Sequence, residues 1–272
     1  MAETNQNQGF FGKLLSLPND SPKKTIIVAT LLCLVCSVLV STSAVMLKPL
    51  QQANKQTDIK KNILAVTGLL TEEADINTLF EQFEIKIVDL ETDEYSDVDP
   101  ATYDQRKASS DPDQSIKLTA EQDIASIKRR AKLATIYILK EGDNIKQVVL
   151  PIHGYGLWST LYGFISFERD FNTIGGLQFY AHAETPGLGG EVDNPKWRQQ
   201  WQGKKAFNDK GELEIKVIRG HVDYKAAGAE HKVDGLSGAT LTSRGVSNLV
   251  NYWLGDHAFG PYLKKMRAEV EK

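Results

Sequence analysis

Hydroxyl-bearing and small residues gather in one segment of the chain, Asp234–Ser243, whose letters are DGLSGATLTS. Gly238 and Ala239 leave the neighbouring Thr240 uncrowded, so its hydroxyl could reach an external phosphorus atom. An apolar helical pattern follows at once, and the free N–H groups and positive dipole end of a helix start favour an anion such as phosphate. An ordinary Ser/Thr helix cap after a tight turn would use the same residue types, so the residues alone leave both interpretations open.

Two further segments have the composition to meet a flat ring. His182–Glu191 (HAETPGLGGE) combines one proline with three glycines, which gives a rigid but sterically open loop. Such a loop can bring backbone N–H and C=O groups against a heteroaromatic ring. Gly154–Trp158 (GYGLW) places aromatic surface beside flexible backbone. A plain connecting turn and ordinary core packing are the respective alternatives.

The remaining residues exclude several common kinds of site. The five histidines are scattered, without an H-E-x-x-H pair or paired metal-ligand spacing, so neither a metal site nor a catalytic residue is predicted. The G-x-x-x-x-G-K spacing of a nucleoside-triphosphate loop is absent, and Ser237 does not stand in a G-x-S-x-G motif. With 32 basic against 35 acidic residues, the chain lacks the positive excess that would hold a nucleic acid.

An uncharged stretch from Thr25 to Leu47, rich in Ile, Val, Leu and Ala, is long enough to cross a membrane as a tilted helix. A cleaved signal peptide is the competing interpretation, but its apolar region is usually shorter. We expect a retained anchor, and lysines at both ends leave its orientation undecided. Cys33 and Cys36 lie inside the stretch and are expected to be small apolar residues of this helix.

Beyond the anchor, hydrophobic periodicity predicts an α+β domain with a mainly antiparallel sheet and flanking helices. Helices are expected over 59–70, from Ala74 through Phe83, from Asn194 with Pro195 in its first turn, and after Thr240, where an apolar stripe (Val246, Leu249, Val250, Trp253 and Leu254) ends at Gly255. Strands are expected over 84–90, 134–139, 145–152, 162–167, 177–181 and 214–218, with Gly175-Gly176 as a break. The segment 89–113 holds nine acidic residues, two basic ones and two prolines, and is expected to be a solvated loop. Calcium binding is the alternative, but the spacing of a calcium loop is absent.

Taken together, these segments resemble the C subunit of the sodium-translocating NADH:quinone oxidoreductases of bacterial inner membranes. The resemblance covers nearly the whole chain, and its most specific element is Ser237-Gly238-Ala239-Thr240, which matches the family's S/T-G-A-T flavinylation motif. The G subunit of the related Rnf complex shares that motif, the anchor and a loop like Glu184–Gly189. The segments 158–160, 190–195 and 252–255 look like the quinone-reductase protein and favour it.

The resemblance implies a flavin mononucleotide (FMN) held covalently by a phosphoester bond to Thr240 and attached by a flavin transferase. The expected FMN contacts are Ser237, Gly238, Ala239 and Thr242 around the phosphate, Thr185 and Leu188 on the isoalloxazine, and further contacts at Glu184, Gly187, Gly189 and Trp158.

The resemblance also implies a cytoplasmic tail (1–24), a transmembrane helix (25–47) and a periplasmic FMN-binding domain (48–272) in a multi-subunit translocase. The FMN would relay electrons between a membrane iron-sulfur centre and the flavin of a neighbouring subunit. NADH, ubiquinone and sodium belong to other subunits, so the chain alone is expected to have no NADH or quinone activity. The alternatives are the flavin subunit of an Rnf complex, a membrane-anchored flavin-binding sensor, and a protein that binds a phosphate ligand without a covalent bond.

Overall fold

The structure is a computed structural model that describes residues 18, 20–71, 75–142 and 144–270. It divides into two compact units, Met1–Gln56 and Thr57–Lys272. One long helix, α2 (Pro22–Val66), forms most of the first unit and contributes its last turns to the second. Two separate helices were expected here, at 25–47 and 59–70. The residues between them are mostly good helix formers, and Pro49 is accommodated within the helix, so the two predicted elements are one.

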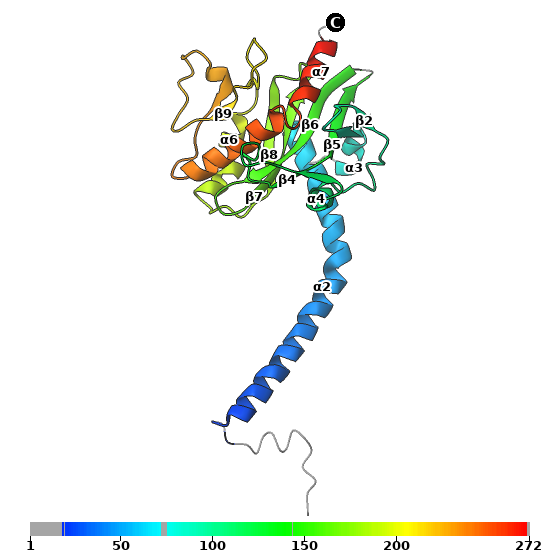
Figure 1. Ribbon diagram of the computed structural model, residues 1–272, viewed down its shortest axis with the longest axis vertical. Helices are drawn as coiled ribbons and strands as arrows, with labels where there is room; N and C mark the ends of the chain where they lie inside the picture. The colour runs from blue at the N-terminus through cyan, green and yellow to red at the C-terminus, as the bar shows by residue number, and fades with distance from the viewer. Residues whose placement is uncertain (1–17, 19, 72–74, 143, 271–272) are drawn as a thin grey trace, which may run out of the picture. The chain divides into compact units, whose positions relative to one another are not determined.

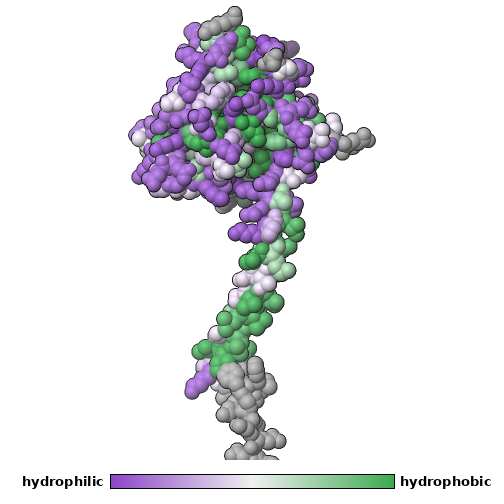
Figure 2. Space-filling view, turned by 90° about the vertical axis from the view of Figure 1, so that its right-hand side faces the viewer, coloured by the Kyte–Doolittle hydropathy of each residue, from purple (hydrophilic) through white to green (hydrophobic). Residues whose placement is uncertain are grey.

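The amino-terminal part of α2 is apolar and exposed, as Figure 2 shows by its run of hydrophobic side chains. By length and composition it is able to cross a membrane, and it is the one such helix among the described residues. The other end of α2 stops at Val66 because Gly68 adopts the left-handed conformation (φ +74°) and Leu69 donates its N–H back to the Leu64 oxygen. The predicted extension of this helix to Leu70 is therefore wrong.

The second unit is built on one antiparallel sheet with the strand order β2-β1-β5-β6-β7-β8 (Figure 1). Its strands are β1 (Phe83–Asp89), β2 (Tyr95–Ser96), β5 (Leu133–Glu141), β6 (Asn144–Tyr155), β7 (Thr160–Glu168) and β8 (Ile174–Ala181). Two small sheets add β3 (Ser115–Lys117) with β4 (Arg129–Ala131), and β9 (Lys216–Val217) with β10 (Lys232–Val233). Every pair in the large sheet is antiparallel, which confirms the predicted class.

Short helices and turns surround the sheet. They are α3 (Ile76–Phe80), α4 (Gln105–Ser110), η1 (Gly189–Asp193), α5 (Pro195–Gln199), η2 (Ala229–His231), α6 (Thr240–Leu254) and α7 (Gly260–Val270). As predicted, Asn194 caps α5 by accepting the Lys196 N–H, with Pro195 as the first helical residue.

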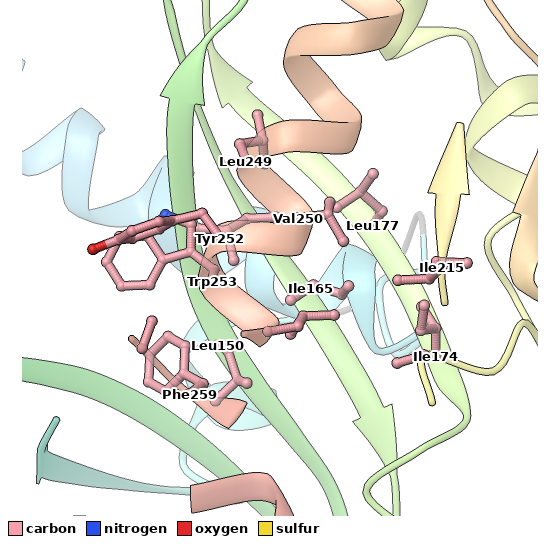
Figure 3. Packing of buried hydrophobic residues seen from close by; sticks show 14 of the residues in the cluster. Leu150, Ile165, Ile174, Leu177, Ile215, Leu249, Val250, Tyr252, Trp253 and Phe259 are labelled. Carbon is pink, nitrogen blue, oxygen red and sulfur yellow. The ribbon is translucent and has the colours of Figure 1, made fainter. Parts of the chain in front are cut away.

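The two faces of the sheet bury different partners because successive strand residues point to opposite sides. On one face, Val148, Leu150 and Ile152 join the core beneath α6. Figure 3 shows α6 side chains, among them Leu249 and Val250, packed over strand residues such as Ile165. On the other face, Val149 and Phe164 pack in a cluster with Ile63, Leu64 and Val66 from the end of α2.

Four predicted elements are corrected. Gly175-Gly176 lies within β8 and does not break it. A glycine is needed at position 176 because a side chain there would come within 2.6 Å of the Val66 oxygen. The helix predicted to run through Phe83 ends earlier, at Phe80 in α3, and Phe83 begins β1. The predicted start of that helix, Ala74, lies outside the described residues. The strand expected over 214–218 shortens to β9, and the segment 89–113 contains β2 and α4 as well as loop. The end of α6 is as predicted, because Gly255 caps the helix, with a φ of −83°.

Candidate functional site

The turn before α6 presents Thr240 at the protein surface. Gly238 is left-handed (φ +71°), and the helix cap is Ala239, which has no side chain able to cap. Thr240 follows as the first helical residue and is exposed. The alternative of a plain Ser/Thr cap therefore does not describe this helix, because no hydroxyl occupies the cap position.

The segment that carries Thr240 is fixed at both of its ends. At its start, the Asp234 carboxylate accepts the Val222 N–H at 2.7 Å and a hydrogen bond from the Gln200 side chain at 3.3 Å. At its end, the buried Ser243 hydroxyl oxygen accepts the Leu236 N–H at 2.9 Å. These bonds hold the turn, so Thr240 is displayed on a defined backbone.

The first turn of α6 has unused donors. Among the described residues, no protein acceptor meets the backbone N–H of Leu241 or Thr242, whereas the Ser243 N–H bonds the Ala239 oxygen at 2.9 Å. Free N–H groups at a helix start, together with the helix dipole, form a site for an anion. Thr240 therefore stands beside donors that suit a phosphate.

Glu184 joins the three predicted segments through its carboxylate. Its Oε1 atom accepts the N–H groups of Leu157 and Trp158 at 3.0 Å and of Ser159 at 3.3 Å. Its Oε2 atom accepts the Thr242 hydroxyl at 2.8 Å. Burial acts to raise the pKa of Glu184, but the hydrogen bonds outweigh burial and hold that pKa below its ordinary value of 4.5. The residue is thus an ionised, almost fully buried acceptor, 5% exposed.

The loop that contains Glu184 is anchored on both sides of it. The His182 Nδ1 atom accepts the Glu184 N–H at 3.2 Å, so the protonated Nε2 donates to the Asp193 carboxylate at 2.8 Å. The Ala183 N–H donates to the Ser159 hydroxyl at 2.7 Å. These hydrogen bonds fix the path of the loop.

Exposed apolar side chains lie on the segments that Glu184 joins. Leu157 is 37% exposed, Trp158 66%, Leu188 44% and Leu241 51%, and we call these four the apolar patch. A side chain built on Gly238 would come within 2.9 Å of a Leu188 methyl group, which places Leu188 against the turn that carries Thr240. Apolar and aromatic surface of this kind suits a flat ring.

The predicted site residues separate into a surface set and a buried set. Ser237, Gly238, Thr240, Thr185, Gly187, Leu188 and Trp158 are exposed, whereas Glu184, Gly189, Ala239 and Thr242 are buried. The Thr242 hydroxyl is fully buried and donates to Glu184, so Thr242 can face a ligand only through its backbone N–H. The Glu184 carboxylate is likewise turned to the protein, where its two oxygens accept hydrogen bonds from backbone N–H groups and from the Thr242 hydroxyl.

Sequence reasoning missed Leu157, Leu241, Ser159 and the His182–Asp193 pair as parts of this site. Leu157 lies within the predicted segment Gly154–Trp158, but the sequence does not indicate that its side chain is exposed. The pairing of His182 with Asp193 joins residues 11 apart across an irregular loop, which no periodicity reveals.

Comparison with known proteins places the site inside a recognised domain. A family model described as "FMN-binding domain" matches residues 156–255. The C subunit of the Na(+)-translocating NADH-quinone reductase of Vibrio vulnificus (strain YJ016) is 51% identical, covering 92% of this chain and 97% of the relative. The protein of the same name from Pseudomonas aeruginosa is 47% identical, covering 91% and 97%.

Solved structures agree with this comparison. The crystal structure of Shewanella oneidensis NqrC superposes with a TM-score of 0.73 at 33% identity, covering 79% of this chain and 99% of that one. The C subunit of the Na(+)-translocating NADH-quinone reductase from Parabacteroides distasonis superposes with a TM-score of 0.62 at 27% identity, covering 80% and 96%. The matched region contains Thr240, Glu184 and the whole apolar patch.

Proposed function

Because this chain belongs to the family of the C subunit of the Na(+)-translocating NADH-quinone reductase, an FMN-carrying electron-transfer protein, we propose that Thr240 holds the FMN through a phosphoester bond. The observation that carries the proposal is the position of Thr240 within the FMN-binding match. Its exposed hydroxyl lies in the first turn of α6, beside the N–H groups of Leu241 and Thr242, for which the described part of the chain supplies no acceptor.

The residues at this turn fit a phosphate ester. The N–H groups offer hydrogen bonds and the helix dipole offers positive potential, while Gly238 and Ala239 add no bulk beside the hydroxyl. Ser237 is exposed beside them and completes the small-residue turn. Of the residues expected around the phosphate, Thr242 contributes through its backbone N–H rather than its hydroxyl.

The apolar patch fits the isoalloxazine. Trp158 and Leu188 provide surface for the ring, and Leu157 and Leu241 add further exposed apolar surface. Thr185 and Gly187 are exposed in the same loop and complete the rim. FMN supplies one-electron chemistry when it is bound, and the protein contributes attachment, orientation and partial exclusion of water. An ester bond at one end leaves the exposed edge of the ring free to approach a partner.

We further propose a place for the chain in the membrane, supported by its family and by the apolar part of α2. In this proposal helix α2 anchors the chain, the second unit lies on the periplasmic side of the bacterial inner membrane, and residues 1–24 lie in the cytoplasm. There it passes electrons between a membrane iron-sulfur centre and the flavin of a neighbouring subunit. A flavin transferase attaches the FMN during maturation.

A direct test is mass analysis of the peptide that contains Thr240, taken from the full chain expressed with and without a flavin transferase. We expect an FMN adduct on Thr240 in the first sample and none in the second. Thr240→Ala removes the adduct. Ser237→Ala and Thr242→Val are the matched controls, because each removes a nearby hydroxyl and leaves Thr240 in place. An unmodified peptide in transferase-competent material, or an adduct that persists in Thr240→Ala, would overturn the assignment.

A second experiment separates the electron carrier from a flavin-binding sensor. The intact complex is purified through a tag on this chain. Co-purification with an NADH-oxidising subunit, and reduction of the bound flavin on adding NADH, are the results expected of a carrier. Isolation of the flavinylated chain by itself in gentle detergent would favour the sensor.

A further inference from the structure

Glu184 forms hydrogen bonds to both of the segments that carry the site, residues 157–159 and the first turn of α6. Three consecutive N–H groups, from Leu157 to Ser159, converge on the single Oε1 atom, so the backbone curls around this oxygen as a nest. The other oxygen accepts the Thr242 hydroxyl, in the first turn of the surface helix that begins at Thr240. One carboxylate therefore sets the position of the apolar-patch loop relative to the attachment turn.

The surroundings of Glu184 leave little room for a different arrangement. A side chain at Gly156 would come within 2.6 Å of Oε1, and one at Gly189 would come within 2.6 Å of both Oε2 and the Thr242 hydroxyl. Real Cβ atoms do not approach other atoms this closely, so both glycines are needed for the carboxylate to reach its donors. The backbone on two sides of Glu184 is thus shaped around the carboxylate.

The negative charge has a defined task in this arrangement. Hydrogen bonds to an ionised acceptor are stronger than those between neutral groups. A glutamine keeps one oxygen for the three N–H groups but turns an NH2 group toward the Thr242 hydroxyl, which must then reverse from donor to acceptor. An alanine leaves all four donors without their partner.

We propose that Glu184 is the positioning residue of the flavin site, fixing the loop of Leu157 and Trp158 against the start of α6 so that the ring attached at Thr240 is held on the apolar patch. This inference rests on the proposed function for the identity of the ring. The link between the loop and the helix is made by hydrogen bonds between protein atoms alone.

The test compares Glu184→Ala and Glu184→Gln with the wild-type full chain in detergent, after flavin attachment. Tryptophan quenches flavin fluorescence on contact, so the ratio of native to denatured fluorescence reports how firmly the ring rests beside Trp158. We expect a low ratio in the wild type, a several-fold higher ratio in Glu184→Ala and an intermediate one in Glu184→Gln. Covalent flavin per chain, measured after denaturation, normalises the signal. Glu191→Gln is the matched control, because within the described part of the chain its carboxylate accepts a side-chain hydrogen bond from Asn194 alone, and we expect no change.

A flavin-free arm separates this proposal from the assignment of Thr240. In a Thr240→Ala background, which carries no ester, amide hydrogen exchange is followed at Leu157, Trp158 and Ser159. We expect exchange roughly tenfold faster with Glu184→Ala, the factor for losing about one net hydrogen bond, and a smaller increase with Glu184→Gln. If Glu184→Ala does not fold, Glu184→Gln alone decides. Unchanged exchange and an unchanged fluorescence ratio in a folded Glu184 variant would overturn the proposal, whereas a wild-type chain without covalent flavin would overturn only the Thr240 assignment.

Discussion

The Ser243 hydroxyl oxygen accepts the backbone N–H of Leu236 at 2.9 Å, and this buried bond closes the turn that displays Thr240. The bond spans seven residues and ties the turn to the first turn of α6. Its loss would leave a buried N–H without an acceptor.

Ser243→Ala is therefore expected to lower the free energy of unfolding by about 1–3 kcal/mol, the cost of an unpaired buried donor. Ser237→Ala changes an exposed serine in the same turn and should fall within about 0.5 kcal/mol of the wild type. Urea unfolding of both variants gives the comparison. Equal stabilities of the two variants would show that the Ser243 bond does not hold the turn.

Thr242→Val keeps the shape of a fully buried side chain and deletes its hydrogen bond to Glu184. A hydrogen bond to a charged group contributes about 1.5–3 kcal/mol, and we expect a loss of stability in that range. The FMN adduct at Thr240 should persist, because the valine leaves the exposed hydroxyl and the backbone N–H groups of the turn in place. Chemical denaturation and peptide mass analysis check the two halves of this prediction.

His153 gives the fold a pH-dependent stability. Burial and the nearby Arg106 charge lower the pKa of His153 from 6.5 to about 4. Between these values the unfolded chain binds a proton that the folded chain does not. Stability should therefore fall as the pH drops from about 6.5 to about 4, by up to about 1.4 kcal/mol per pH unit.

The matched control for this titration is His153→Phe, which keeps the ring contacts to Tyr162 (5.4 Å between centroids) and Trp253 (4.9 Å) and cannot titrate. Free energies of unfolding measured from pH 7 to pH 4 should show a shallower slope in this variant. Parallel curves for the variant and the wild type would assign the pH dependence to other groups.

The end of α2 belongs to the core of the second unit. Ile63 and Leu64 are completely buried there, and the Val66 oxygen accepts the Ser166 hydroxyl at 2.8 Å. A fragment that begins at Thr57 should fold cooperatively, whereas one that begins at Thr67 loses these side chains, each of which contributes about 1.5–3 kcal/mol when fully buried. Thermal unfolding by circular dichroism distinguishes them. Equal melting temperatures would show that the last turns of α2 are dispensable.

Local patterns in the sequence predicted the elements whose partners lie close along the chain. The stripe of Val246, Leu249, Val250, Trp253 and Leu254 follows the helical repeat, and all five residues are buried in α6. The hairpin of β5 and β6 follows from two β-rich runs with a turn sequence between them, and Glu141 pairs with Asn144 as that pattern indicates. In both cases the information lies within one element or one turn.

The support beneath the site was not predictable in the same way. Glu184 and Thr242 are 58 residues apart, and nothing in either segment specifies that they meet. A contact between distant residues also explains why a break was wrongly predicted at Gly175-Gly176. Gly176 is a glycine because Val66, from a helix far away in the sequence, approaches it closely. Thr240 could be proposed from the sequence because its motif is compact, whereas the exposure of Leu157 and Leu241 depends on the assembled fold.

Thr240 begins a helix of the second unit whose inner side is set among the sheet residues. For a flavin esterified at Thr240, as proposed, the attachment point would stay fixed relative to the sheet. The movement of the ring would then be set by the rotatable bonds of the threonine side chain, the phosphoester and the ribityl chain, and would be limited by contact with the apolar patch. Electron-transfer distances would therefore depend on that contact and on the orientation of the whole protein, and not on movement of the backbone at the attachment point.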